Sequence, residues 1–490
     1  MPQNRTIGNF FNTNNIPLII FLLVTISAFI SLFMVQYSHD DAGFYFKHAQ
    51  EVASGANGLL YRDIELNYSP LPIYLYSLVF NISKDLPVNG MFLLVNYLFI
   101  LGTSFFMYKI FKIINAKNSL SFIALSIYIV SIIGMSISST EHFVVFFEVL
   151  MLYLLLTENR VSFVIAGISA FLAFYSKQYG LISIAVGGLY FLINKSKIYK
   201  LPYFLIGLII PNIVLFFFYN SVEGFSIFDL YENLLFPQKN ESVLTGENYG
   251  VMIFIKGVIQ FFMIIPYLFL SVYFYFSKRL YTNKTTNYFL IFGLASFAPL
   301  LIASYLHYYL LILPFVVLFS VSIFKEYDFK NRSLNKILGI LVAITIICSI
   351  GAFYRIKNID GKYIPTRTIR QNPNAVILND CVSLNKIIPR GSKVFIVDAV
   401  FYYYPADFYS IDLKNLGYTW AQQYSNVDDI LKYLNKDEYI LTNAKSRFKS
   451  YVNFAEQNAM HNPEFEVTKW TGNYHYLKTQ EIIYYILRKK

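Results

Sequence analysis

Charged residues, cysteine and tryptophan are all scarce in this sequence. Only 14% of the 490 residues are Asp, Glu, Lys or Arg, whereas soluble globular proteins contain roughly 25%. This shortage excludes an ordinary soluble domain. The two cysteines are Cys348, inside an apolar run, and Cys381, in a polar tail. Such a pair argues against a disulfide framework and against a thiolate metal site. Because tryptophan occurs only twice, a membrane-interface belt would have to rely on tyrosine.

Hydrophobic residues take the place of the missing charges. They make up 56% of the chain, and 48 Phe and 42 Tyr bring the aromatic fraction to 19%. This composition predicts a multi-span membrane protein. The first apolar run, residues 16–35, is long enough to span and is not followed by a small-residue cleavage site. We therefore expect it to be an anchor and not a cleaved signal peptide.

The formal net charge is +11. A nucleic-acid ligand would call for basic residues clustered on one face, but here Lys and Arg are scattered over short loops. Lys and Arg concentrate in the loops of a membrane protein that stay in the cytoplasm. The charge pattern therefore predicts a membrane lipid bilayer as the partner and no nucleic acid.

The apolar runs predict an α-helical module over residues 1–354, with about eleven spans of roughly 20 residues each. The Lys and Arg bias places the N-terminus in the cytoplasm. An odd number of spans then places the first loop (37–88), the loop at 221–250 and the C-terminal tail on the outer face. The predicted spans are residues 16–36, 89–113, 119–137, 141–157, 161–176, 179–194, 201–220, 251–276, 287–304, 308–324 and 336–354.

The tail, residues 355–490, has charges throughout and only short apolar segments. A turn at 390–392 leads into a β-branched and aromatic stretch up to residue 404, which is typical of a strand. A short helix over 428–434 and a second strand over 439–441 are expected to follow. We predict a small extracytoplasmic α/β domain.

The first outer loop carries the most unusual residues. Asp40 and Asp41 follow the first apolar run directly, where a helix would leave the membrane. They could simply cap that helix, but two neighbouring carboxylates raise each other's pKa, which suits one of them to accept a proton near neutral pH. Two amphipathic stretches, residues 42–53 and 69–80, are too short to span. We expect them to be membrane-surface helices that frame a groove.

Three motifs in this loop, H-D-D-A-G-F-Y-F-K-H-A, G-L-L-Y-R-D and S-P-L-P-I-Y-L-Y, together resemble a known family. It comprises the protein O-mannosyltransferases and lipid A aminoarabinose transferases, which are GT-C membrane glycosyltransferases that use polyprenyl-phosphate sugars. The resemblance implies that Asp40 is the catalytic base and Asp41 its acidic partner. It also implies that Tyr61, Arg62 and Asp63 form the second motif block.

Later matches to the same family are short. S-S-T-E-H-F contains Glu141 and His142, F-Y-S-K-Q-Y-G-L contains Lys177, and H-Y-Y-L-L-I-L-P runs from His307 through Tyr308 to Pro314. The resemblance implies that Lys177, Arg62 and His307 bind the donor phosphate. It implies substrate binding by Tyr61, Asp63, Glu141, His142 and Tyr308. The sequence departs from the family at Asp41, which is often Glu, and at Asn96, which is often Arg.

Each of these residues also has a simpler interpretation. Lys177 has no carboxylate nearby in the sequence, so in a span it needs a cavity or an anion such as a lipid phosphate; alternatively it reaches the headgroups. Arg62 is equally suited to a phospholipid headgroup, and His307 to an ordinary interfacial histidine. Glu141 and His142 could cap a helix. Glu148, deeper in the same span, needs a partner inside the bundle.

The function that the resemblance implies is transfer of a glycosyl unit from a polyprenyl-phosphate sugar donor to a hydroxyl acceptor. The acceptor is a lipid, glycan, cell-surface polymer or protein, and the reaction takes place, with inversion, at the outer face of a bacterial cytoplasmic membrane. No cofactor is required and no metal ligand set is indicated, although the loop carboxylates could recruit a divalent ion. The alternatives are an oligosaccharide ligase or polymerase and a non-enzymatic flippase or transporter.

Overall fold

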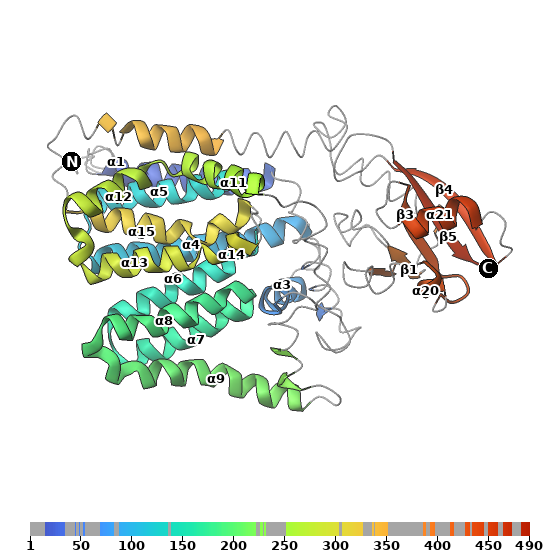
Figure 1. Ribbon diagram of the computed structural model, residues 1–490, viewed down its shortest axis with the longest axis horizontal. Coiled ribbons are helices and arrows are strands. Elements are labelled where there is room, and N and C mark those ends of the chain that lie inside the picture. Colours follow the sequence, from blue (N-terminus) through green and yellow to red (C-terminus); the bar gives the residue numbers. More distant parts are fainter. Residues whose placement is uncertain are drawn as a thin grey trace, which may run out of the picture. The chain divides into compact units, whose positions relative to one another are not determined.

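The computed structural model describes two groups of residues. The first covers most of the helical module: 15–34, 69–82, 88–135, 139–221, 251–302, 306–326 and 339–350. The second lies in the tail: 386–388, 393–396, 412–415, 427–431, 434–444, 449–458, 464–472 and 482–490. Isolated positions between 45 and 53, between 226 and 231, and at 336–337 are also described. The helices from α1 to α15 belong to one compact unit, and all described strands belong to a second (Figure 1).

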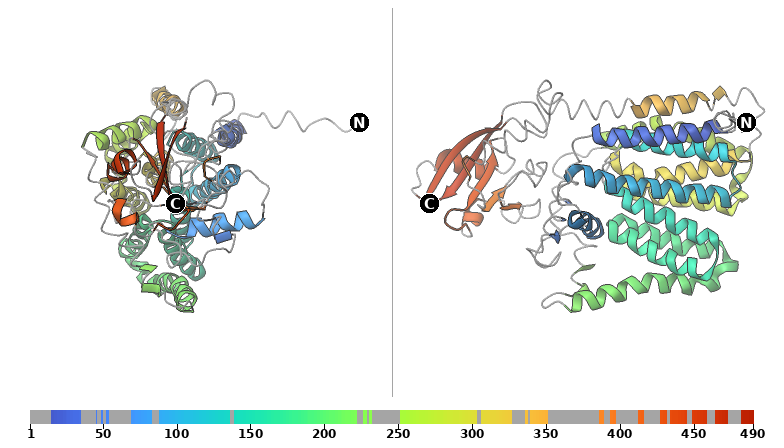
Figure 2. Two further views of the ribbon diagram at one scale, coloured as in Figure 1. Left: turned by 90° about the vertical axis from the view of Figure 1, so that its right-hand side faces the viewer. Right: turned by 180° about the vertical axis from the view of Figure 1, so that it is seen from behind.

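The apolar runs that the sequence predicts as spans form helices, some of them with breaks. Figures 1 and 2 show the helices of these runs packed together, with the long ones side by side along one common direction. They are α1 (Ile16–Met34), α4 (Val88–Ile113), α5 (Asn118–Met135), α6 (Glu141–Thr157), α7 (Arg160–Ser176), α8 (Leu181–Ile193), α9 (Leu201–Asn220), α11 (Val251–Ile264), α12 (Tyr267–Ser277), α13 (Lys284–Ala295), α14 (Ala298–Ile302), α15 (Leu313–Phe324) and a last helix at Gly339–Ile350.

Two described helices are long and apolar enough to cross a membrane, at Leu94–Ile113 and Lys195–Asn220. A third crossing results if Gly257–Ile264 and Tyr267–Ser277, which are bent by 78°, count as one span. The other apolar stretches, among them Ile16–Ile30, have 10–17 residues each, fewer than the roughly 20 of a typical crossing. The prediction of a helical, apolar module is therefore confirmed. The predicted number of about eleven spans is larger than the two or three that these helices show, and it stays a prediction.

Several predicted spans are not continuous α-helices. The run at 251–276 breaks at Ile265 and Pro266, because proline lacks the N–H that would continue the ladder of hydrogen bonds. The run at 287–304 breaks between α13 and α14. The run at 308–324 starts as the 3-10 helix η6 (Leu306–Leu311) and becomes α-helical only at α15. The apolar composition predicts burial in these runs but does not indicate the breaks.

The second amphipathic stretch of the first loop is the helix α3 (Leu71–Ile82), with Pro72 in its first turn. This confirms the predicted helix there. The first stretch, residues 42–53, lies outside the described residues except for isolated helical positions, among them the buried Tyr45 and Ala49.

Helices α7 and α9 cross at two glycines. A Cβ atom on Gly207 would lie 1.9 Å from the carbonyl oxygen of Val164, and one on Gly167 would lie 2.1 Å from that of Phe204. No side chain fits at either position. Away from this crossing α9 exposes large apolar side chains, including Ile209, Val214 and Phe217. Such a face suits contact with lipid and not with water.

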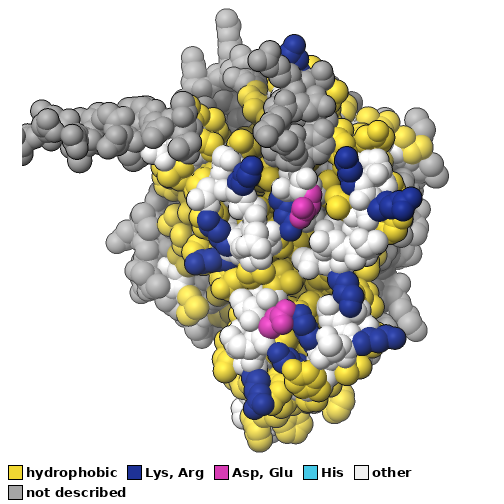
Figure 3. Space-filling model, turned by 90° about the vertical axis from the view of Figure 1, so that its left-hand side faces the viewer, with side chains coloured by type: hydrophobic (Ala, Val, Ile, Leu, Met, Phe, Trp, Pro, Cys, Tyr) yellow, Lys and Arg dark blue, Asp and Glu magenta, His cyan; other side chains and the backbone are white. Residues whose placement is uncertain are grey.

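The antiparallel helices give the bundle two ends, which we call the basic end and the cluster end. The basic end contains the connections that follow α4, α6, α8 and α12 and the last turn of α15. Lys325 beyond α15 donates to the carbonyl oxygen of Ile114 beyond α4, at 2.9 Å. Figure 3 shows that this face carries many Lys and Arg side chains and few carboxylates. The cluster end contains the N-termini of α6 and α8 and the C-terminus of α7.

The C-terminal unit contains a mixed sheet with the order β2-β1-β3-β5-β4. Strands β2, β1 and β3 are parallel, and β5 pairs antiparallel with both β3 and β4. Buried Ile440, Tyr451 and Leu487 belong to its core. The predicted strands and helix correspond to β1, α20 and β3, whereas β2, β4 and β5 were not predicted. The elements are β1 (Lys393–Ile396), β2 (Asp412–Asn415), α20 (Val427–Leu431), β3 (Tyr439–Asn443), α21 (Lys449–Asn453), β4 (Phe465–Gly472) and β5 (Ile482–Lys489).

Candidate functional site

The strongest candidate site is a buried ion pair at the cluster end. Glu141 is the first residue of α6 and Lys177 directly follows α7. Their side chains form a salt bridge in which Lys177 is 4% and Glu141 1% exposed. Lys177 is thus not without a carboxylate: the anion that it needs in an apolar setting is Glu141, which the sequence analysis had not paired with it. Without such a partner, either charge would be costly to bury.

The backbone after α7 holds Lys177 in place. Lys177 has an extended conformation (φ −160°, ψ 152°), and its N–H still donates to the carbonyl oxygen of Ala173, at 3.2 Å. The chain then folds back tightly through η2 (Gln178–Gly180). A Cβ atom on Gly180 would lie 2.1 Å from the Ala173 carbonyl oxygen. The glycine of K-Q-Y-G is therefore needed for the chain to fold back here and enter α8.

Two tyrosines from distant segments complete this cluster. The ammonium nitrogen of Lys177 lies 5.7 Å from the ring centroid of Tyr308, which belongs to η6. The hydroxyl of Tyr179 donates to that of Tyr308 at 2.9 Å, and the two rings meet edge to face with centroids 5.0 Å apart. A cation near an aromatic face is attracted by the electrons of the ring. Lys177 therefore meets a carboxylate and an aromatic ring together.

A chain of hydrogen bonds connects the ion pair to helix α3. The hydroxyl of Tyr76 in α3 donates to the Oδ1 atom of Asn96 in α4 at 2.7 Å. The amide of Asn96 donates to the carbonyl oxygen of Ser139 at 3.2 Å, and the Ser139 hydroxyl donates to Glu141. Asn96, where the family often has Arg, thus holds the loop that begins α6 and does not supply a cation.

Helix α1 leads toward this cluster end. Phe21, in the first half of α1, lies against Phe122 near the start of α5, at the basic end. Phe29, in the second half, lies against Tyr97, which adjoins Asn96. The hydroxyl of Tyr97 also donates to the carbonyl oxygen of Thr25, at 2.8 Å. The chain therefore leaves α1 at the end of the bundle that holds the Glu141–Lys177 pair.

Several predicted site residues lie outside the described residues: Asp40, Asp41, Tyr61, Arg62 and Asp63. The backbone at His307 belongs to η6, next to Tyr308, but its side chain is not among those described. Glu141, Lys177 and Tyr308 are brought together by the structure. The roles of all these residues stay predictions.

His142 is buried, at 1% exposure, beside Glu141 in the first turn of α6. Glu148 is buried two turns further along the same helix. The partner that it needs is Ser183 of α8, whose hydroxyl donates to the Oε1 atom of Glu148 at 3.0 Å. Its Oε2 atom has no hydrogen-bond partner. Glu148 therefore belongs to the interior of the bundle, between α6 and α8.

Within the described residues, no group of three or more His, Cys, Asp and Glu side chains is placed to hold a metal ion. The acidic residues of the first loop are not among those searched. That no metal or other cofactor is required stays a prediction.

Tyr76, Ser139 and Tyr179 were not predicted as site residues. The sequence does contain a signal for the Glu141–Lys177 pair, in the lengths of the two helices. Helices α6 and α7 both have 17 residues and are joined only by Glu158 and Asn159. Two antiparallel helices of equal length bring the start of the first beside the end of the second. No comparable signal places Tyr308 there, because a series of broken helices precedes it.

A scan against models of known protein families found no match, and no curated protein matches this chain either.

Proposed function

We propose that this protein transfers a glycosyl unit from a polyprenyl-phosphate-linked sugar to a hydroxyl acceptor at the outer face of the bacterial cytoplasmic membrane. One observation carries the proposal. The buried cluster of Glu141, Lys177 and Tyr308 lies at the end of the bundle where α1 ends and the chain continues toward Asp40 and Asp41. The resemblance of the first loop to GT-C glycosyltransferases gives the acidic pair its chemistry.

In this proposal Asp40 takes the proton of the acceptor hydroxyl while that oxygen bonds to the anomeric carbon of the sugar. The bond between the anomeric carbon and the phosphate oxygen breaks, and polyprenyl phosphate leaves from the opposite side. The configuration is therefore inverted. Asp41 would raise the pKa of Asp40 by like-charge repulsion.

The charge that develops on the leaving phosphate needs fixed cations. Lys177, Arg62 and His307 are the residues proposed to bind this phosphate. The ion pair with Glu141 changes what Lys177 can do. Glu141 already compensates its charge, so a phosphate would have to share Lys177 with Glu141 or displace the carboxylate. Tyr308 and His142, with Tyr61 and Asp63, would bind the sugar.

The basic end supports the orientation. Short loops rich in Lys and Arg stay in the cytoplasm, so the face shown in Figure 3 would be cytoplasmic. The cluster end would then face outward, where a polyprenyl-linked donor presents its sugar. The C-terminal unit would be extracytoplasmic.

A flippase for the same lipid-linked sugar is the second candidate. Transporters often have discontinuous helices near their substrate site, and the 78° bend between Gly257–Ile264 and Tyr267–Ser277 is such a feature. A flippase would move the donor lipid without breaking the sugar–phosphate bond.

The test is sugar transfer in membranes that contain the full-length protein and a panel of radiolabelled polyprenyl-phosphate sugars. We expect Asp40→Asn to lower transfer by at least a hundredfold, the lower range for loss of a general base. Asp437→Asn is the matched control, because it makes the same chemical change at an exposed residue of the C-terminal unit. If Asp40→Asn keeps wild-type transfer at normal protein levels, the base assignment is wrong. If labelled donor crosses the membrane intact and no transfer occurs, the flippase is favoured.

A further inference from the structure

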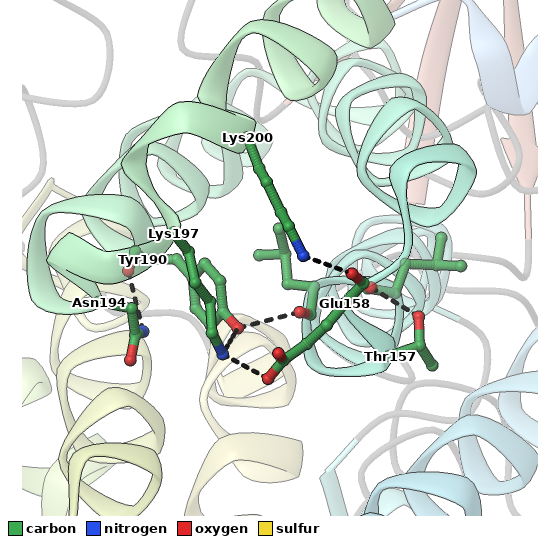
Figure 4. Close-up of polar contacts among 8 residues, drawn as sticks. Thr157, Glu158, Tyr190, Asn194, Lys197 and Lys200 are labelled. Carbon is green, nitrogen blue, oxygen red and sulfur yellow. Dashed lines mark hydrogen bonds and ion pairs between the residues drawn. The ribbon is translucent and has the colours of Figure 1, made fainter.

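The basic end contains a compact group of four cations on two neighbouring connections. Arg160 begins α7, and Lys195, Lys197 and Lys200 belong to the 3-10 helix η3 (Lys195–Lys200) between α8 and α9. Glu158, in the two-residue connection between α6 and α7, forms a salt bridge with Lys197. Figure 4 shows that this contact brings the two connections together. The four cations therefore lie on two connections that meet at Glu158, which is the single carboxylate among the described residues of these connections.

Two of the four cations have a structural role at the end of α6. Glu158 is in the left-handed conformation (φ 64°) that ends this helix. Lys200 donates to the carbonyl oxygen of Glu158 at 2.8 Å. Lys197 reaches the hydroxyl of Tyr190 at 3.1 Å, and that hydroxyl donates to the carbonyl oxygen of Leu155 at 3.0 Å (Figure 4). Positive charge at a helix C-terminus, where carbonyl groups are left unpaired, is stabilising.

The other two cations have no such role. Arg160 and Lys195 are both exposed, and no carboxylate of the described residues forms an ion pair with either. The guanidinium carbon of Arg160 lies 5.6 Å from the ring centroid of Tyr203, in the first turn of α9. Both charges are therefore available to a ligand outside the protein.

Apolar side chains surround these charges. Val161 and Tyr199 are each 67% exposed and Ile198 is 48% exposed. Val161 directly follows Arg160, and Ile198 and Tyr199 lie between Lys197 and Lys200 in the sequence. Helix α9, which starts here, exposes apolar residues along most of its length. Exposure of such an apolar surface to water is unfavourable, whereas the headgroup region of a bilayer accommodates apolar and basic side chains together.

From this arrangement we propose that Arg160 and Lys195, with the exposed Tyr199, form a basic surface that binds the phosphate headgroups of anionic phospholipids. The occupant is a membrane lipid and not a soluble anion, because the flanking residues and α9 offer an apolar surface that suits acyl chains. Lys197 and Lys200 shape this basic surface by fixing η3 on the end of α6. The proposal does not depend on glycosyl transfer.

The test measures lipid binding to the detergent-purified full-length protein by native mass spectrometry. The probes are dioleoylphosphatidylglycerol, dioleoylphosphatidylcholine and inorganic phosphate. Wild-type protein should bind phosphatidylglycerol more tightly than phosphatidylcholine. The double variant Arg160→Gln/Lys195→Gln should bind phosphatidylglycerol about thirtyfold more weakly, from the contribution of a basic residue at an anionic surface applied twice. Lys436→Gln/Lys449→Gln, which removes two exposed charges from the C-terminal unit, should bind like wild type.

Three results would overturn the proposal: equal binding of both lipids by wild-type protein, unchanged binding by Arg160→Gln/Lys195→Gln, or displacement of phosphatidylglycerol by millimolar inorganic phosphate. A thermal scan without added lipid separates binding from folding. Arg160→Gln/Lys195→Gln should melt like wild type, whereas Lys197→Gln should melt at a lower temperature, because it loses contacts with Glu158 and Tyr190. If Arg160→Gln/Lys195→Gln itself unfolds early, its charges are structural and the assignment is wrong.

Discussion

Helix α6 has a Lys–Glu ion pair at each of its two ends, and the two pairs differ in their surroundings. At the cluster end Glu141 meets Lys177, with 1% and 4% of the side chains exposed. At the basic end Glu158 meets Lys197, with 45% and 22% exposed. The same two residue types are thus dehydrated in one place and wet in the other.

The difference indicates different purposes. An exposed pair is screened by water and salt and contributes little. A buried pair gains at best what its own dehydration costs, so burial is weak evidence for a stabilising role. A hydrophobic pair would suit the cluster end as well if stability were all that mattered. The retention of charge there, next to Tyr308 and Tyr179, favours a functional role, while the basic-end pair fixes a loop.

The largest effect is expected when the buried pair is broken. Glu141→Gln leaves the ammonium group of Lys177 without its carboxylate in a dry setting, and loss of one partner of a buried pair costs about 3–5 kcal/mol. Detergent-induced unfolding of the full-length protein, followed by circular dichroism, measures this change.

The matched variant is Glu141→Gln/Lys177→Met, which removes both charges. It should recover most of the lost free energy of unfolding, because no charge is left buried without a partner. If the double variant is as unstable as Glu141→Gln, the loss comes from the altered α6 terminus and not from the isolated charge. Under the proposed function it should fold and still fail to transfer sugar.

A smaller effect is expected from the hydrogen-bond chain that leads to this pair. Asn96→Leu removes the acceptor of the Tyr76 hydroxyl and the donor to the Ser139 carbonyl oxygen. A buried donor or acceptor that is left without a hydrogen-bond partner lowers the free energy of unfolding by about 1–3 kcal/mol. Tyr76→Phe removes only the first contact and should cost about 0.5–1.5 kcal/mol. Equal losses in both variants, in the same unfolding measurement, would show that the bond to Ser139 contributes nothing.

The helices of this fold could be predicted from the sequence because long apolar runs in a chain with few charges have one physical solution. Residues 141–157 and 201–220 were predicted with the bounds that the structure gives. The break at Ser296 could not be predicted, since apolar composition is the same on both sides of it. Pro266 did offer a signal for the break at Ile265, because proline interrupts a helix, but that signal was not used. In the tail, β4 mixes charged, polar and aromatic residues, which hides the strand pattern. β5 is a run of isoleucine and tyrosine followed by Leu-Arg-Lys, and this strand signal was not used.

The site could be predicted only in part. Glu141, Lys177 and Tyr308 were chosen as individual residues through the family resemblance, and the structure adds their contact. The anion beside Lys177 was not found, because a carboxylate 36 positions away is not near in the sequence. Asn96 was noticed as a departure from the family, but its contacts with Tyr76 and Ser139 depend on packing between α3, α4 and the start of α6.

The smallest effect is expected at the basic end. Glu158→Gln keeps the left-handed residue and the carbonyl that Lys200 binds, and removes only the charge that meets Lys197. The change in the free energy of unfolding should be about 0–1 kcal/mol at low salt and should vanish near 1 M NaCl, where the Debye length is about 3 Å. The loss in Glu141→Gln should persist at the same salt concentration, because water and ions do not reach a dry pair. If salt abolishes both losses equally, the two ends do not differ in hydration, and the argument for a functional charge at Lys177 fails with it.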